Sequence, residues 1–363
     1  MAQQLHETGE KKKRALLVNL SDDGVGELQG LVKTLELEIA SQEVVKIRER
    51  SPKFGMGSGK AEEIAGKAKE LEADCLVFDW DSSPSQQRNW EELAGIPVID
   101  RQELIINIFA MRAATREADL QVQLAELHYR LPRLTHKYID LSRQRGGRYG
   151  TRGAGETKLE TDRREIQKRI HRLEKELEDV AKQRQVQRRQ RERQGLPVCA
   201  IVGYTNAGKS SLFNALSGSA VLVEDKLFAT LDATTRRFEP APGTESLLTD
   251  TVGFIRRLPH NLIKAFRSTL EEASHSSLLI HVLDAADPNI ESCFSTTVSV
   301  LQELGAGEIP VITVLNKTDL LPDESQADAL LSLFPQSLGL SVKTGKGLDQ
   351  LKLRIAEKLG MRN

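Results

Sequence analysis

The sequence predicts an α/β protein whose carboxyl-terminal part is a doubly wound sheet, preceded by a smaller α/β domain and a long antiparallel helical hairpin. Runs of β-branched and other apolar residues alternate with amphipathic stretches both before residue 100 and after residue 195. This alternation is typical of parallel sheets covered by helices. Between the two regions, apolar residues recur every three or four positions over long distances, which is the spacing of helices that pack along one stripe.

The composition is that of a globular protein without a membrane segment. The 363 residues suffice for two or three domains, and 39% are hydrophobic and 28% charged. No apolar stretch approaches the roughly 18 residues that a membrane-spanning helix needs, and the amino terminus lacks an apolar signal core. The distant cysteines Cys75, Cys199 and Cys293 are expected to be buried thiols rather than disulfide or metal ligands. We therefore expect a cytoplasmic protein with no membrane span.

Charge is distributed unevenly along the chain. Residues 101–193 contain 23 lysines and arginines against 14 acidic residues, although the whole chain carries a net charge of −1. A basic segment of this size is where a polyanion would bind.

Residues 1–14 predict a flexible amino terminus, and residues 15–100 predict the small α/β domain. A helix should begin at Ser83 and Pro84, because serine caps helix N-termini and proline is tolerated in the first turn. The four strands of the domain are expected at 15–20, 44–47, 75–79 and 97–99.

A glycine-rich turn at 54–60 ends in a lysine and imitates a phosphate-binding loop. We interpret it as the start of a helix capped by Ser58, because Phe54 stands where the first glycine of such a loop belongs and Ala61 replaces the hydroxyl residue. The alternative is that Lys60 contacts an RNA phosphate.

Residues 101–194 predict the helical hairpin. The first long helix carries leucines spaced four, three and four residues apart and should stop at Pro132, and the second carries a heptad seam from Leu159 to Val180. Neither helix is long enough for a free-standing coiled coil, so an antiparallel pair with one buried stripe is expected.

The loop between these helices, residues 143–156, is rich in glycine and arginine and has almost no apolar side chains to bury. The far end of the second helix, residues 181–193, has six lysines or arginines against one glutamate. Arginine with a stackable tyrosine suits folded RNA, which is recognised through shape and phosphates. The candidate RNA-binding residues are Arg143, Arg145, Arg148, Tyr149 and Arg152, together with Lys60.

Residues 195–363 predict a nucleotide-binding domain. The apolar run 198–202 leads into a glycine-rich turn and then an amphipathic helix, the context that identifies a phosphate-binding loop. Its backbone N–H groups, the positive end of the helix and the Lys209 ammonium would cradle a triphosphate, and the Ser210 hydroxyl would ligate Mg²⁺. The expected nucleotide-binding residues of the loop are Gly203, Tyr204, Thr205, Asn206, Ala207, Gly208, Lys209, Ser210 and Ser211.

Two further segments are expected to meet Mg²⁺ and the γ-phosphate. In the polar stretch 229–237, Thr235 is favoured over Thr234 to bring a hydroxyl to Mg²⁺ when the γ-phosphate is present. Asp250 ends the next expected strand and would hold Mg²⁺ directly or through water, and Gly253 would offer its N–H to the γ-phosphate. The expected metal ligands are Ser210, Thr235 and Asp250, and the candidate catalytic residues are Lys209, Thr235, Gly253 and Asn206.

The base is expected to be guanine. An apolar strand ends in Asn316, Lys317 and Asp319, and the Asp319 carboxylate can accept both N1–H and the N2 amine of guanine, whereas adenine offers neither donor there. Asn316 and Lys317 would brace the loop and cover the base, and N–H groups of a later loop would meet guanine O6. That loop is Ser341, Val342 and Lys343. These elements together predict a Mg²⁺-dependent GTP-binding domain that binds GTP and GDP.

Two side chains bear on hydrolysis. Phe254 stands directly after Gly253, where many regulatory GTPases have a water-orienting glutamine, so hydrolysis by the isolated protein should be slow. Asn206 resembles the asparagine with which cation-dependent GTPases hold K⁺ beside the phosphates; the alternative is that it only shapes the loop.

The chain resembles the HflX family of ribosome-associated GTPases over nearly its whole length. The segments that carry the resemblance lie in all three regions: residues 57–60, 83–89, 100–101, 108–110, 121–127, 131–134, 153–156, 159–164 and 203–214. Ala154 stands where that family commonly has proline, and Ser211 replaces a frequent threonine. The chain ends 20 residues after Lys343, so the further carboxyl-terminal domain of some relatives is expected to be absent.

The resemblance implies a GTPase that is stimulated by the ribosome, binds the 50S subunit through rRNA, and reaches toward the peptidyl transferase region with its glycine and arginine loop. It further implies splitting or rescue of stalled ribosomes, often under stress, and we expect a monomer. Two alternatives remain at this point: a GTP-gated scaffold that binds protein partners through the hairpin, and a ribosome-assembly GTPase.

Overall fold

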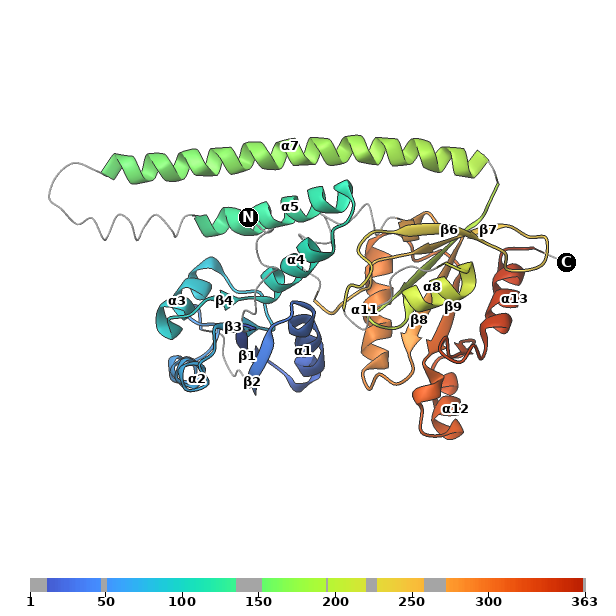
Figure 1. Ribbon diagram of the computed structural model, residues 1–363, viewed down its shortest axis with the longest axis horizontal. Helices are drawn as coiled ribbons and strands as arrows, with labels where there is room; N and C mark the ends of the chain where they lie inside the picture. The colour runs from blue at the N-terminus through green and yellow to red at the C-terminus, as the bar shows by residue number, and fades with distance from the viewer. Residues whose placement is uncertain are drawn as a thin grey trace. The chain divides into compact units, whose positions relative to one another are not determined.

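The computed structural model describes residues 12–46, 51–134, 152–193, 195–219, 227–257 and 272–361, and its elements are labelled in Figure 1. The described residues form two compact units. The first contains the chain up to Ile108 and Tyr129–Ile166; the second contains Phe109–His128 and the chain from Gln167 onward.

The amino-terminal part is a four-stranded parallel sheet in the order β2-β1-β3-β4, with helices between its strands. The strands are β1 (Arg14–Asn19), β2 (Glu38–Val44), β3 (Cys75–Phe78) and β4 (Val98–Ile99), and the helices are α1 (Val25–Thr34), α2 (Ser58–Glu70) and α3 (Pro84–Ala94). The expectation of a strand at 44–47 is wrong, because β2 ends at Val44. This strand lies at the edge of the sheet and pairs with β1 through its backbone, so a mixed polar sequence is tolerated there.

Aromatic rings fill the core of this sheet and helix layer. The Trp90 indole is fully buried and donates a hydrogen bond to the Phe54 carbonyl oxygen (2.9 Å), and it packs edge-on against Phe78. The capping prediction for α3 is confirmed, since Ser83 and Gln86 form a reciprocal capping box. The prediction for α2 is wrong: Gly57 is the N-cap, without a side-chain hydrogen bond, and Ser58 is already the first helical residue.

A buried set of ion pairs fixes the start of α4 (Arg101–Arg112) to this domain. The Arg101 guanidinium is 2% exposed, pairs with Asp79 at 2.5 Å and also pairs with Glu27. Arg133 pairs with the buried Asp100 carboxylate at 2.8 Å and lies 3.5 Å from the centre of the Tyr129 ring. Buried charges need such partners to offset their desolvation.

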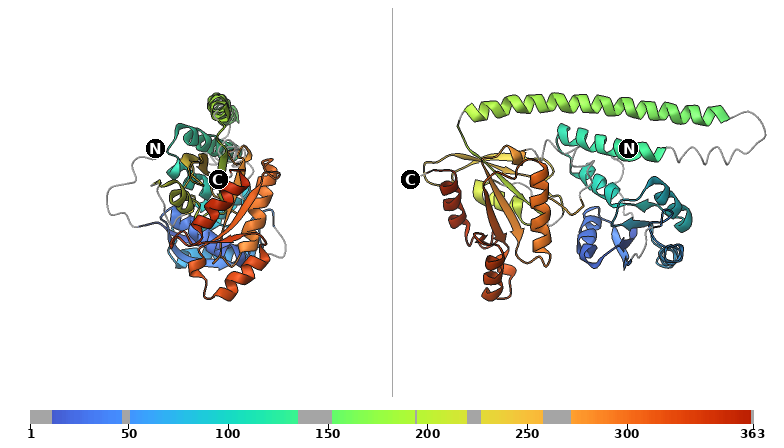
Figure 2. Two further views of the ribbon diagram at one scale, coloured as in Figure 1. Left: turned by 90° about the vertical axis from the view of Figure 1, so that its right-hand side faces the viewer. Right: turned by 180° about the vertical axis from the view of Figure 1, so that it is seen from behind.

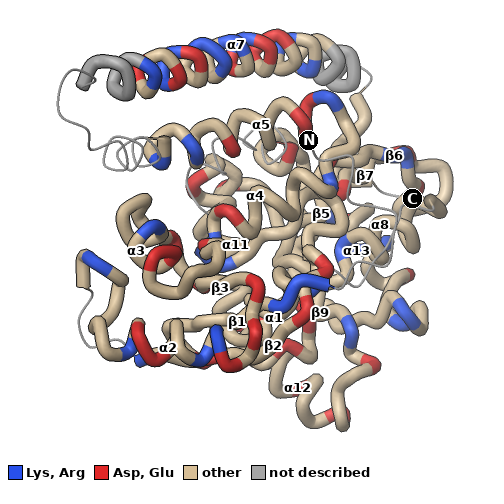
Figure 3. The backbone as a smooth tube through the Cα atoms, turned by 60° about the vertical axis from the view of Figure 1, so that its left-hand side comes forward, with Lys and Arg blue, Asp and Glu red and all other residues tan. Residues whose placement is uncertain are grey.

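The predicted helices of the middle region are α5 (Arg116–Arg130), closed by a 3-10 turn (Leu131–Arg133), and α7 (Arg152–Arg193). The two run antiparallel, since Arg116 pairs with Glu176 (3.2 Å) whereas the later Gln123 accepts a hydrogen bond from the earlier Arg169 (3.0 Å). Leucines of α5 are buried, as are Ile170 and Leu173 of α7. Along the backbone tube of α7 in Figure 3, stretches coloured for lysine and arginine are interspersed with stretches coloured for aspartate and glutamate.

The helix α7 begins at Arg152, inside the stretch 143–156 that the sequence predicts as a loop. Extending an existing helix costs little per residue, so even glycines can join its first turn.

The carboxyl-terminal sheet has six strands in the order β10-β9-β8-β5-β7-β6. The strands expected at 198–202, before Asp250 and before Asn316 are present as β5 (Val198–Gly203), β7 (Ser246–Asp250) and β9 (Val311–Asn316), and β8 (Leu278–Asp284) and β10 (Leu338–Gly339) complete the parallel strands. An additional strand, β6 (Thr234–Phe238), runs antiparallel to β7 at the edge. The helix expected after the phosphate-binding loop is α8 (Lys209–Ser217), and the structure further shows α11 (Ile290–Glu303), α12 (Glu324–Leu333) and α13 (Leu348–Lys358).

Helices cover both faces of this sheet, which confirms the doubly wound fold. Val282 packs in one cluster with residues of α8 and α13, while its neighbour Leu283 packs with Ile290 of α11, because successive side chains of a strand point to opposite faces. The two views in Figure 2 show α11, in orange, and α13, in red, on opposite sides of the strands. This winding places the carboxyl ends of the parallel strands together at one edge, where ligands bind in such folds.

None of the helices in the described part of the chain is long and apolar enough to span a bilayer. The three cysteines are buried and none forms a disulfide, as the sequence predicts.

His281 lies in the core of β8 and has an unusual environment for a titratable group. Its ring is 1% exposed and stacks on Phe294, and its Nε2 atom has no hydrogen-bond partner. Burial, followed by the nearby Lys209 charge, lowers the pKa of His281 to about 3. The native fold therefore holds this histidine neutral.

Acid should destabilise the carboxyl-terminal domain through this residue. The unfolded chain binds a proton at His281 below about pH 6.5 and the folded chain does not, so unfolding free energy is lost as pH falls, by about 1 kcal/mol between pH 7.5 and 5.5. His281→Phe keeps a ring in the stack and should remove that part of the loss, measured by urea unfolding at both pH values. The same substitution at the 87% exposed His171 is the control, and an unchanged pH dependence in His281→Phe would contradict the assignment.

Candidate nucleotide-binding site

The loop between β5 and α8 is shaped by two glycines that no other residue can replace without strain. Gly203 has φ +145°, and a Cβ there would lie 2.2 Å from the Val282 carbonyl oxygen. Gly208 has φ +91°, and a Cβ there would lie 2.2 Å from the Asn316 Nδ2 atom. L-residues rarely adopt such angles, so the loop can lie this close to β8 and to Asn316 only with glycine at both positions.

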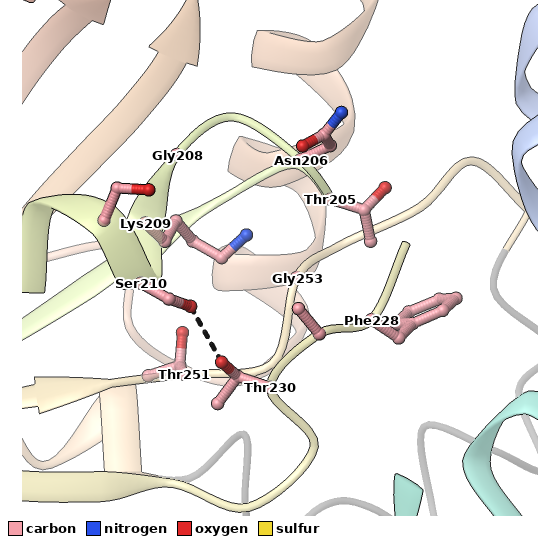
Figure 4. A pocket seen from close by; sticks show the side chains of 11 residues that line it. Thr205, Asn206, Gly208, Lys209, Ser210, Phe228, Thr230, Thr251 and Gly253 are labelled. Carbon is pink, nitrogen blue, oxygen red and sulfur yellow. Dashed lines mark hydrogen bonds between the residues drawn. The ribbon is translucent and has the colours of Figure 1, made fainter. Parts of the chain in front are cut away.

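Lys209 brings a cation into the pocket that this loop encloses. Its side chain is 6% exposed and its Nζ atom donates to the Tyr204 carbonyl oxygen at 2.6 Å. Burial lowers the pKa of Lys209 to about 8, and the Asp250 carboxylate opposes that shift. Figure 4 shows the ammonium among the pocket residues, which include Thr205, Asn206, Ser210 and Ser211. A buried, incompletely compensated cation is suited to bind an anionic phosphate.

A group of three oxygen-bearing side chains lies beside Lys209. The Ser210 hydroxyl is 2.7 Å from Asp250 Oδ2, and the Thr230 hydroxyl is 2.8 Å from Ser210 Oγ and 3.0 Å from Asp250 Oδ2. Burial raises the pKa of Asp250, although Lys209 and the two hydroxyls act in the opposite direction. The other carboxylate oxygen, Oδ1, is buried and has no hydrogen-bond partner. A set of oxygen donors with one unsatisfied carboxylate oxygen fits Mg²⁺.

The structure places a different threonine in this group from the one that the sequence favours. The Thr235 hydroxyl lies in β6 and pairs with Thr249 Oγ1 of β7 at 3.0 Å, and Thr234 is paired with Asp250 in the strand register. The backbone of β6 and β7 forms an antiparallel pair, which commits both residues to the sheet. Thr230 was missed because the sequence alone does not show where the polar segment ends and β6 begins.

Gly253 closes the pocket on the side of the next loop. A Cβ at this position would lie 2.8 Å from Lys209 Nζ and 2.8 Å from Thr205 Cγ2, so a larger residue would collide with the phosphate-binding loop. Phe254 is 1% exposed, and its backbone exchanges hydrogen bonds with Gly203 (3.0 Å) and Thr205 (2.8 Å). The ring is therefore part of the core and offers no polar atom to a water molecule.

Asn206 lies at the rim of the pocket. Its backbone has φ +61° and its side chain is exposed. A positive φ is more accessible to asparagine than to most residues, so the structure is compatible both with a shaping role and with a ligand role.

The residues expected at the guanine base are brought together from two loops, and Asn316 also joins them to the phosphate-binding loop. The Asn316 amide is 2% exposed, donates to the Ala207 carbonyl oxygen (2.9 Å) and accepts from the Val342 N–H (3.2 Å). The Asp319 carboxylate accepts from the Ser341 hydroxyl at 2.6 Å, and this hydrogen bond lowers the pKa of Asp319. An ionised acceptor is thereby kept beside the N–H groups of the loop that includes Lys343.

Lys317 is held by an ion pair that the sequence did not reveal. Its Nζ atom lies 2.6 Å from Asp284 Oδ2 at the end of β8, and its backbone has φ +63°. This pair fixes the lysine side chain next to Asp319.

The expected RNA-binding residues are only partly described. Arg143, Arg145, Arg148 and Tyr149 lie outside the described residues, and Arg152 is the first residue of α7. Lys60 is in the first turn of α2, where its Nζ atom pairs with Glu63 at 2.6 Å. It is far in sequence from the pocket residues and does not line that pocket.

Comparison with known proteins covers all three regions of the chain. Residues 22–110 match a family model described as the N-terminal region of GTP-binding GTPases, residues 112–191 match their middle region, and residues 198–317 match a 50S ribosome-binding GTPase. A protein named GTPase HflX from Akkermansia muciniphila is 48% identical over 99% of this chain and 87% of its own length. The GTPase HflX of Escherichia coli is 44% identical over 92% of this chain and 78% of its own length.

A solved structure is similar over nearly the full length as well. The GTP-binding protein of Sulfolobus solfataricus, crystallised in complex with GDP, has a TM-score of 0.50 and 25% identity, with coverage of 96% of this chain and 99% of that one.

Substitution can distinguish the roles of Thr230 and Thr235. Thr230→Ala removes a hydroxyl from the oxygen group and should lower the rate of Mg²⁺-dependent GTP hydrolysis by about 100-fold while changing GDP affinity by less than about threefold. Thr235→Ala removes only a strand contact and should keep nearly the full rate. Single-turnover hydrolysis and fluorescent GDP titration measure both effects, and a larger loss in Thr235→Ala would show that the segment rearranges around the nucleotide.

Proposed function

This chain belongs to the HflX family of GTPases and hydrolyses GTP. We propose that it does so at this site and that its GTP form docks on the 50S ribosomal subunit through rRNA, to split or rescue stalled ribosomes under stress. The observation that carries the proposal is a complete nucleotide pocket joined in one chain to a long charged hairpin. The match of residues 198–317 to a 50S ribosome-binding GTPase supports the choice of partner.

At the phosphates, the residues of the pocket supply charge and position. The Lys209 ammonium and the N–H groups at the start of α8 would bind the β- and γ-phosphates, and Gly253 would donate its N–H to the γ-phosphate. Ser210, Thr230 and Asp250 would hold Mg²⁺, which neutralises charge on the phosphate oxygens when bound. Phosphoryl transfer needs little covalent help, so this positioning and charge stabilisation would provide the catalysis.

At the base, selectivity for guanine would rest on Asp319. Its carboxylate is ionised and braced by Ser341, so it can accept two hydrogen bonds from guanine N1–H and N2–H₂. A base without those donors would leave the carboxylate unpaired, which is costly.

Phe254 cannot orient the water that attacks the γ-phosphate, because its ring has no polar atom and is buried in the core. We therefore propose that hydrolysis is slow in the isolated protein and is stimulated on the ribosome. The exposed Asn206 amide at the pocket rim is the group we propose for K⁺, whose positive charge would lie beside the phosphates.

The hairpin favours RNA over a coiled-coil protein as its partner. At the centre of the α7 stripe Ile170 and Leu173 are already buried, and Val186 is an isolated exposed apolar side chain (58%). The outer face of α7 exposes charged side chains instead, among them Arg172 at 80% and Lys182 at 72%. Phosphate contacts can use such a face, whereas a protein partner would need a free apolar seam.

Binding to ribosomal particles should depend on both nucleotide and salt. Protein loaded with a nonhydrolysable GTP analogue should cosediment with purified 50S subunits, and affinity should fall by about 1,000-fold between 50 and 200 mM salt if six or more phosphates are contacted. The GDP form should bind more weakly, and 50S subunits should accelerate GTP turnover. Equal binding of both nucleotide forms would refute the proposal.

The remaining alternatives give different results in the same experiment. A protein scaffold would show little salt dependence and no stimulation by subunits. A ribosome-assembly factor would prefer immature particles to mature 50S subunits, and splitting is measured separately by the conversion of 70S ribosomes to subunits in light scattering.

The K⁺ proposal predicts a specific loss. Replacing Na⁺ by K⁺ should accelerate GTP hydrolysis by the unmodified protein, because K⁺ adds positive charge near the transferred phosphate. Asn206→Ala should abolish the difference between the two salts while GDP affinity stays within about twofold. Equal rates in K⁺ and Na⁺ for the unmodified protein would leave Asn206 with a shaping role only.

A further inference from the structure

The short segment that carries Thr230 is fixed on both sides by the corner between α4 and α5. Phe228 precedes Thr230 by two residues and Asp232 follows it by two. Two residues span at most about 7 Å, so any movement of either neighbour reaches the Thr230 hydroxyl directly.

The first anchor is an aromatic contact. Phe228 is 2% exposed, and its ring meets that of Phe109, near the end of α4, at a centroid distance of 4.7 Å and an angle of 89°. Its backbone has φ +56°, a conformation that is uncommon for a bulky residue. Burial of the ring in this edge-to-face pair holds the turn that delivers Thr230 to the pocket (Figure 4).

The second anchor is a helix cap supplied from a distant part of the chain. Asp232 Oδ2 accepts hydrogen bonds from the backbone N–H groups of Ala114 (3.4 Å) and Thr115 (3.2 Å), and Oδ1 accepts from the Thr115 hydroxyl (2.5 Å). Thr115 directly precedes α5, and its hydroxyl in turn accepts from the Ala118 N–H at 3.2 Å. A carboxylate at a helix N-terminus is favourable because it satisfies orphan donors and faces the positive end of the dipole.

The first turn of α5 is in turn tied to α7. Arg116 pairs with Glu176 at 3.2 Å, and Glu117 pairs with Arg184 at 2.8 Å. Hydrogen bonds therefore join Asp232 to the start of α5, ion pairs join the start of α5 to α7, and short stretches of backbone connect these contacts to one another and to Thr230.

We propose that Asp232 is a positioning residue for GTP hydrolysis: by capping α5 it holds Thr230 beside Ser210 and Asp250, and it couples the nucleotide pocket to the helical hairpin. Because Thr230 and Asp232 are only two residues apart, fixing either side chain restricts the other, and such coupling would be reciprocal. A partner that fixes α5 promotes the active position of Thr230, and GTP with Mg²⁺ strengthens the cap. This inference rests on the proposed nucleotide chemistry and is independent of the identity of the partner.

Kinetics of matched variants test the positioning role. Asp232→Ala should lower the rate of GTP hydrolysis by about fivefold and raise the Mg²⁺ concentration for half-maximal rate, with GDP affinity changed by less than about twofold. Thr115→Ala should have a similar effect, Thr115→Ser should restore the rate, and the double variant should lose little more than either single variant because both remove the same cap. Asp119→Ala is the control, since Asp119 is also in the first turn of α5 but bonds along the helix to Gln123.

Three outcomes of this series would overturn the inference. The first is an equal loss of hydrolysis rate in Asp232→Ala and Asp119→Ala. The second is that the rate losses of Asp232→Ala and Thr115→Ala multiply in the double variant. The third is that Asp232→Ala and Asp119→Ala both lower the unfolding midpoint and that this lower stability accounts for the rate loss of Asp232→Ala. Absence of GTP hydrolysis in the unmodified protein would instead refute the proposed function.

Amide hydrogen exchange tests the coupling directly. The amides of Ala114 and Thr115 should exchange more slowly with a GTP analogue and Mg²⁺ bound than with GDP bound, and Asp232→Ala should abolish the difference. If the cap has only a structural role, each of the two amides should exchange at the same rate with GDP bound as with the GTP analogue bound. That result would overturn the coupling.

Discussion

The side-chain amide of Asn316 is the interaction on which the nucleotide pocket depends. It joins the phosphate-binding loop, through the Ala207 carbonyl oxygen, to the loop of Val342, at which we propose that the base binds. The amide is buried, and the absence of a side chain at Gly208 is what allows it to reach that position. Because one rigid group fixes two loops from different parts of the chain, the distance between phosphate and base subsites is set before a nucleotide binds, which reduces the ordering cost of binding.

The same pocket buries opposite charges beside each other. Lys209 is 6% exposed and Asp250 is fully buried. Burial lowers the pKa of Lys209 and raises the pKa of Asp250, and both shifts favour the neutral side chain. Their mutual attraction only partly offsets that cost, and the Asp250 Oδ1 atom has no partner. A phosphate next to the lysine and a cation next to the carboxylate would each satisfy a buried group, so binding of nucleotide and metal together would be favoured over binding of either one.

The second compact unit contains the pocket together with most of α5 and the part of α7 from Gln167 onward. The leucines of α5 and the α7 residues Ile170 and Leu173 are buried, whereas charged side chains of α7 such as Arg172 and Lys182 are exposed. The N-terminus of α5 receives its cap from Asp232, two residues after Thr230. The proposed coupling between the nucleotide pocket and the hairpin would therefore act through a few polar contacts at a helix end.

The sequence by itself determined the doubly wound fold, the phosphate-binding loop, the Ser83 cap and the positions of Asp250 and Asn316, because strand periodicity, glycine geometry and strand ends are local properties of the chain. Only the tertiary structure decided that Thr230 rather than Thr235 meets Ser210, that β2 ends where a strand was expected to begin, and that Asp232 caps a helix 117 residues earlier. Each of these depends on which backbone groups pair across the fold, and that choice is made by partners far away in the sequence.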